Sequence, residues 1–188
     1  MASDVLKVVH DTLKKALQEG LADFEPTPEV RLGSLHVEPS TTPIVNVFFH
    51  NLSVNENGAK GLPRRVQLGG PDDGYAFMPP AIPMSLGFLI TVFSDDVSLQ
   101  LALIGKVAQI FQETPRRRPP TGSSYEEMIS FTPDTRLTPN RVTELFRSHS
   151  AASRLSVGYI TRVELRSEKV LREAPTTRSL NHKLRRQG

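Results

Sequence analysis

The sequence has no cysteine among its 188 residues, and no apolar run approaches the roughly 18 residues needed to span a bilayer. Without cysteine there can be no disulfides, thiolate catalysis or cysteine-based zinc sites, which suits a protein that folds in a reducing cytosol. Charged residues such as Asp4, Lys7 and Asp11 interrupt the N-terminal apolar pattern, so we expect no signal peptide. We therefore expect a soluble, cytoplasmic protein without a membrane partner.

Residue patterns typical of catalytic sites are also missing. Ser85 lacks the leading glycine of a nucleophile elbow and precedes a strand rather than following one. Asp95 and Asp96 are adjacent, so their side chains point in different directions and do not form a catalytic carboxylate pair. Aspartates at the start of a helix are ordinary capping residues. The five histidines are far apart, with no pair three or four residues apart: His10, His36, His50, His149 and His182. We expect no enzymatic activity, no metal, no cofactor and no small-molecule substrate.

Positive charge is concentrated near the C-terminal end. Residues 168–188 carry six Lys or Arg against two Glu, which gives +4, whereas the whole chain carries only +3. A second basic block, residues 116–118, lies between prolines. Neither block has the interleaved aromatics of a dedicated nucleic-acid surface, so we do not expect nucleic acid to be the main partner.

The central stretch, residues 78–112, gives the clearest structural signal. Prolines hold residues 79–83 extended, and residues 84–93 have the composition of a buried strand. An amphipathic helix then follows from the spacing of Val97, Leu101, Ile104, Val107, Ala108 and Phe111, with Ser94 or Asp95 as its cap. The residues predicted to be buried between sheet and helix are Phe88, Ile90, Val92, Leu101, Ile104 and Phe111.

Weaker patterns flank this unit. Besides a first helix and a short helix opened by Thr138 and Pro139, they predict strands near residues 30–37, 44–52, 128–132 (an edge strand) and 155–166. His50 and Asn51 could form a polar site, although a strand that reaches the surface also explains them. We predict one α/β (α+β) domain over residues 1–167, with a long loop at 53–78. Its mixed or antiparallel sheet of about four or five strands packs on two main helices, and a basic tail follows at residues 168–188.

Several segments resemble the tail-terminator, or cap, proteins of contractile injection systems. The resemblance runs from about residue 4 to 166, and it is carried by Val45-Asn46-Val47-Phe48-Phe49-His50-Asn51-Leu52, the proline-to-strand run 79–93, the helix 103–111, Leu137-Thr138-Pro139 and Leu155-Ser156-Val157-Gly158-Tyr159. Gly87-Phe88 and Phe146 stand where the family often has a tyrosine pattern and a tryptophan. The resemblance implies a non-catalytic homohexameric ring that closes the distal end of the inner tube and meets the last sheath layer.

Candidate interaction residues follow from charge and from the loop composition. They are Arg116, Arg117 and Arg118, which we expect to reach outward, the tail residues Lys183, Arg185 and Arg186, and the apolar residues Tyr75, Phe77 and Met78. In a cap, these residues would contact another cap subunit, the inner tube protein or the sheath protein. The alternatives are a solvated basic surface, or a basic-tailed binding module for nucleic acid or an acidic protein surface.

Overall fold

The computed structural model describes residues 2–38, 40–54, 64–67, 75–123, 125, 127–166 and 171–172. Its helices are α1 (Ala2–Gly20), α2 (Val97–Glu113) and α3 (Pro139–Ser148). The main sheet contains β1 (Glu29–Leu32), β2 (Ile44–Val54), β5 (Ile82–Phe93), β6 (Arg116–Arg117), β7 (Ile129–Pro133) and β8 (Ser156–Leu165). A second sheet contains β3 (Arg64–Gln67), β4 (Tyr75–Met78) and β9 (Leu171–Arg172).

The main sheet is mixed and follows the order β1-β2-β5-β8-β7-β6. Only β1 and β2 pair in parallel, and the other neighbours are antiparallel. This confirms the predicted fold class with one or two more strands than expected. The extra strand at one edge is β6, so β7 is not the outermost strand that its sequence suggested.

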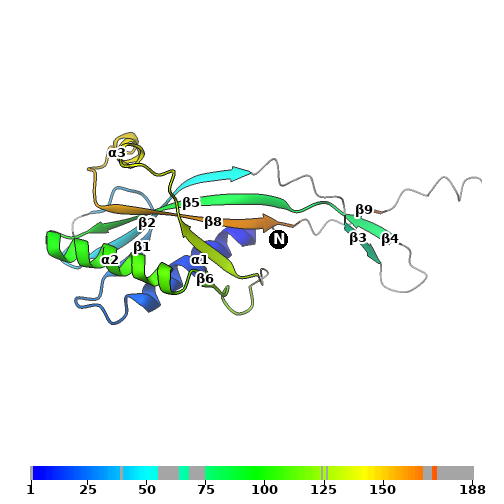
Figure 1. Cartoon of the computed structure of the whole chain (residues 1–188), viewed down its shortest axis with the longest axis horizontal. Coiled ribbons are helices and arrows are strands. Elements are labelled where there is room, and N and C mark those ends of the chain that lie inside the picture. Colours follow the sequence, from blue (N-terminus) through cyan, green and yellow to red (C-terminus); the bar gives the residue numbers. More distant parts are fainter. Residues whose placement is uncertain are drawn as a thin grey trace, which may run out of the picture.

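The sheet separates two layers, with α1 and α2 on one face and α3 on the other (Figure 1). On one face, α1 and α2 pack on alternate residues of β5, including Leu86, Phe88 and Ile90. On the other face, the short helix α3 covers Leu89 of β5 through the buried Phe146. The strand β5 is therefore covered on both sides, which explains why its sequence is an almost unbroken apolar run.

The helix α2 is rotated relative to the prediction. Its buried residues are Leu103, Val107, Ile110 and Phe111, whereas Leu101 is 59% exposed and Val97 is 67% exposed. Two apolar stripes of the same period run along this helix, and the spacing alone does not say which one faces the sheet. The prediction chose the wrong stripe for Leu101, while Ile104 lies partly buried at its margin.

The cap of α2 also differs from the prediction. Asp96 is the N-cap, and its Oδ1 accepts hydrogen bonds from the backbone N–H of Ser98 at 2.8 Å and of Leu99 at 3.3 Å. Ser94 acts one step earlier, because its hydroxyl accepts from the Asp96 N–H at 3.2 Å. The acidic turn starts the helix as expected, one residue later than predicted.

Part of the predicted long loop forms strands. β2 continues to Val54, and β3 pairs antiparallel with β4 inside residues 53–78. β4 also pairs with β9, which belongs to the predicted tail. This small sheet lies beyond one end of the main sheet (Figure 1). The boundary between residues 167 and 168 stays a prediction, since residues 167–170 and 173–188 lie outside the described residues.

The two leucines of α2 provide a direct test of the helix orientation. Leu103→Ala should lower the free energy of unfolding by about 2–5 kcal/mol, because it opens a cavity in the core. Leu101→Ala should change it by less than about 0.5 kcal/mol, because an exposed side chain loses few contacts. Urea unfolding of both variants measures this, and equal losses would contradict the orientation of α2.

Candidate functional site

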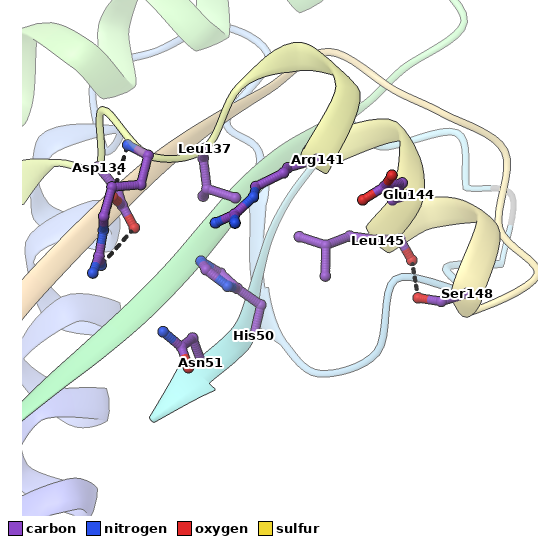
Figure 2. Close-up of a pocket in the computed structure, with 9 residues that line it drawn as sticks. His50, Asn51, Asp134, Leu137, Arg141, Glu144, Leu145 and Ser148 are labelled. Atoms are coloured by element: carbon purple, nitrogen blue, oxygen red, sulfur yellow. Dashed lines mark hydrogen bonds and ion pairs between the residues drawn. The ribbon is translucent and has the colours of Figure 1, made fainter. Parts of the chain in front are cut away.

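A polar hollow of about 440 Å³ lies on the sheet face that carries α3 (Figure 2). Its walls come from three segments: the middle of β2, the turn between β7 and α3, and α3 itself. Among the residues that line it are His50, Asn51, Asp134, Arg136, Arg141 and Glu144. We call this feature the α3 hollow.

A β-bulge brings His50 into the α3 hollow. In the pairing of β2 with β5, Phe49 lies opposite Phe88 and Asn51 lies opposite Gly87, so His50 is an extra residue without a partner position. A bulge of this kind redirects a side chain and is frequent beside functional sites. Figure 2 shows the imidazole rising from β2 toward α3.

Two glycines make room for the side chains above the sheet. A Cβ at Gly87 of β5 would lie 2.7 Å from Cε1 and 2.8 Å from Nε2 of His50. A Cβ at Gly158 of β8 would lie 2.4 Å from Cδ1 of Leu137. The imidazole and the leucine therefore rest directly on the sheet backbone, which side chains at these two positions would prevent.

An ion pair orders the turn between β7 and α3. The side chain of Asp134 is only 4% exposed, and its carboxylate accepts from Nε of Arg136 at 2.9 Å and from Nη2 at 3.2 Å. It also accepts from the Arg136 backbone N–H at 3.1 Å. These bonds hold the pKa of Asp134 below its usual value, and the bond from the Arg136 side chain has the largest effect. Asp134 is therefore a satisfied structural carboxylate.

The other polar groups of the hollow are less satisfied. Burial lowers the pKa of His50 from its usual 6.5, with Asp134 acting in the opposite direction and Arg136 in the same direction. Its Nε2 is buried and has no hydrogen-bond partner in the described part of the chain. The guanidinium of Arg141 points toward the imidazole in Figure 2. It makes no ion pair with another described residue.

A second feature is the outer edge of β2. β1 pairs with β2 only from Ile44 to Val47, so no strand among the described residues pairs with residues 48–54 on that side. We call these residues the open edge. Three of its large apolar side chains are exposed: Phe49 at 45%, Leu52 at 44% and Val54 at 52%. Where β1 ends, a hollow of about 270 Å³ is lined by Leu32, Val47, Phe48, Phe49 and Phe88 among others.

The predicted arginine block lies on the opposite edge of the sheet. Arg116 and Arg117 form β6, while Arg116 and Arg118 are exposed. Arg117 does not reach outward as predicted: Nη2 donates to the Ile110 carbonyl at 3.2 Å, and the side chain is partly buried. The carbonyls of the last turn of α2 attract this cation, which explains the correction.

Three of the remaining predicted interaction residues are described, and they lie outside both features. Tyr75, Phe77 and Met78 form β4 in the small sheet, where Phe77 and Met78 are half-buried. Lys183, Arg185 and Arg186 lie outside the described residues.

Sequence reasoning missed both features. The sequence allows His50 and Asn51 to be a polar site, but the simpler interpretation, a strand that reaches the surface, does not predict a half-buried imidazole. One signal was present, because the apolar alternation at 45, 47 and 49 resumes at 52 and 54. A change of parity within one strand indicates a bulge. Nothing in the sequence links Asp134 or Arg141 to His50.

The described residues contain no group of three or more His, Asp or Glu that could hold a metal ion. None of the described helices is long and apolar enough to cross a membrane. The chemistry available in the α3 hollow is hydrogen bonding and charge pairing, from a neutral imidazole, two guanidinium groups and two carboxylates.

Comparisons with known proteins give consistent similarities. The family model of the Pvc16 N-terminal domain matches residues 8–179. One similar solved structure is the PVC sheath/tube terminator of an extracellular contractile injection system in its extended state, at 12% identity and a TM-score of 0.61. Another is the tube-terminating cap of the anti-feeding prophage, at 14% identity and a TM-score of 0.59. No match was found among curated proteins.

The two structural matches differ in how much of each chain they cover. They include 90% and 89% of this chain but 60% and 57% of the other chains, so this chain spans about three-fifths of their length. At these identities, the likeness establishes a shared fold.

The lowered pKa of His50 predicts a stability change in weakly acidic solution. Because the folded state disfavours the protonated ring, unfolding takes up a proton, and the free energy of unfolding should fall as the pH drops below about 6.5. Asp134, whose pKa is also lowered, should add its own loss only below about pH 3.8. Denaturant unfolding between about pH 7 and pH 5 isolates the histidine effect.

Two variants assign this effect to one residue. His50→Asn should flatten the decline in unfolding free energy over that pH range, whereas His10→Asn, at an exposed position on α1, should keep the wild-type decline. An equally steep decline in His50→Asn would show that the α3 hollow does not cause it.

Proposed function

Because the chain belongs to the Pvc16 N-terminal domain family, a tail-terminator family of contractile injection systems, we propose that it is a structural cap. In this proposal, it closes the distal end of the inner tube and contacts the last layer of the sheath. It acts as a homohexameric ring, assembles in the cytoplasm and performs no catalysis. The observation that carries the proposal is the family match over residues 8–179, which includes the main sheet, α2, α3 and α1 from residue 8 onward.

The open edge of β2 supports a role in assembly. Unpaired strand edges bind extended segments of other chains, and proteins usually protect them when no partner exists. The opposite edge of the sheet is protected in this way: β6 has only two residues, both arginines, and Pro119 and Pro120 follow it. The open edge has neither proline nor lysine, and it carries exposed Phe49, Leu52 and Val54. We propose that it contacts another protein of the particle.

The charged residues have a secondary place in this proposal. Arg116 and Arg118 are exposed on the far edge, where they can pair with carboxylates of an adjacent subunit, tube or sheath. We propose the same role for Lys183, Arg185 and Arg186 of the tail, and an apolar contact for Tyr75, Phe77 and Met78. A ring follows from symmetry, because identical subunits that cap a tube form closed cyclic assemblies that match it.

Two exposed leucines provide a matched test in assembling particles. Leu52→Lys places a charge on the open edge, and Leu101→Lys places the same charge on the exposed side of α2. We expect Leu52→Lys to lower cap occupancy and to disturb the fixed tube length, because burying an unpaired ammonium in an interface is costly. We expect Leu101→Lys to behave as wild type. Electron micrographs of purified particles give both quantities.

The outcomes separate the two parts of the proposal. If the wild-type chain is absent from particle ends and its deletion leaves tube length unchanged, the cap function is wrong. If the wild type caps and Leu52→Lys caps equally well, the function stands and the open edge is not the contact surface. Circular dichroism of both variants establishes that they fold.

A further inference from the structure

We propose that the α3 hollow binds a carboxylate group of a partner protein, held between the guanidinium of Arg141 and the imidazole of His50. The site shares His50 and Asn51 with the open edge but lies on the face of the sheet that carries α3. Leu52 of the open edge instead pairs with Leu86, which faces α1 and α2. The inference does not depend on the proposed cap function. The carboxylate can belong to an Asp or Glu side chain or to a chain terminus, because both present the same two oxygen acceptors.

Arg141 supplies the charge for this site. It lies in the first turn of α3, which starts at Pro139 with Thr138 as N-cap. That first turn contains no acidic residue. A cation at this end of a helix is disfavoured by the helix dipole, so helix stability does not explain Arg141. An anion beside it would be favoured by both the guanidinium and the dipole, and a guanidinium binds a carboxylate through two parallel hydrogen bonds.

His50 supplies the second donor. Its buried Nε2 has no partner among the described residues, and a bare acceptor nitrogen is tolerated there better than an unpaired N–H. We therefore assign the proton of the neutral ring to Nδ1, which is not among the buried, unpartnered atoms. An N–H at this position suits an incoming carboxylate oxygen. The bulge in β2 and the glycine at position 87 fix the ring in place for this contact.

The two carboxylates of the hollow have different effects. Asp134 is held by Arg136 at 2.9 Å and by the Arg136 backbone, so it does not compete for Arg141. Glu144 lies one turn further along α3, lines the same hollow, and has no ion pair with another described residue. Its negative charge opposes an incoming carboxylate, which fixes the sign of its expected effect: neutralising Glu144 should strengthen binding, whereas neutralising Arg141 should weaken it.

The test is an NMR titration of the full chain with defined probes. N-acetyl-glutamate N-methylamide presents a side-chain carboxylate, N-acetyl-alanine presents a terminal one, and N-acetyl-glutamine N-methylamide is the neutral control. We expect saturable shifts of the His50 ring C–H and Arg141 Nε–H signals with a dissociation constant on the order of millimolar for the better carboxylate probe. The better probe identifies the source of the carboxylate. The neutral control should cause no saturable shift.

Three variants on one helix assign the effect. Arg141→Gln should weaken binding about tenfold, the loss of one charge-assisted contact. Glu144→Gln should strengthen it. Arg147→Gln, an exposed arginine in the last turn of α3, should leave it unchanged. The backbone amide spectrum of each variant verifies the fold.

Several results would overturn the inference. Equal shifts with the glutamine control, no saturable shift with either carboxylate, or wild-type affinity in Arg141→Gln would each show that the hollow is not a carboxylate site. Tighter binding of inorganic phosphate than of either carboxylate probe would show that the hollow binds a phosphate group and not a protein carboxylate.

Discussion

The structure depends on the burial of β5 on both faces and its pairing on both edges. β2 pairs along one side from Ile44 to Val54, and β8 pairs along the other over ten consecutive residues of β5. Its even-numbered residues meet α1 and α2, and Leu89 meets the layer under α3. Because each neighbouring element buries its apolar side against this strand, a change in the register of β5 would expose all of them together.

Elements with a single dominant local signal could be predicted from the sequence. The proline lead-in and apolar run locate β5, the Thr138-Pro139 pair opens α3, and the alternation after Leu155 gives β8. The orientation of α2 could not be predicted in the same way, because the stripe through Leu101 and the stripe through Leu103 have similar apolar content. Contact with the sheet decides between them, and that contact is tertiary.

The α3 hollow and the open edge could not be predicted from the sequence for a related reason. His50, Asp134 and Arg141 come from segments more than 80 residues apart at the extremes, and only the pairing of β2 with β5 and the packing of α3 bring them together. The open edge depends on β1 being shorter than β2, which is a property of two strands and not of either one. Arg117 is similar: its sequence context suggests a surface cation, and the end of α2 turns it inward.

The bulge at His50 has a consequence for how this protein can vary. Phe49 lies opposite Phe88 and Leu52 lies opposite Leu86, so three residues of β2 span what two residues of β5 span. Removing one of the two residues between Phe49 and Leu52 would restore an even alternation and leave Leu52 and Val54 in their present register, on their present face of the sheet. It would also abolish the bulge and take one side chain from the floor of the α3 hollow. A deletion here would therefore spare the sheet and alter the hollow, so the fold and the polar site can be changed independently at this point of the chain.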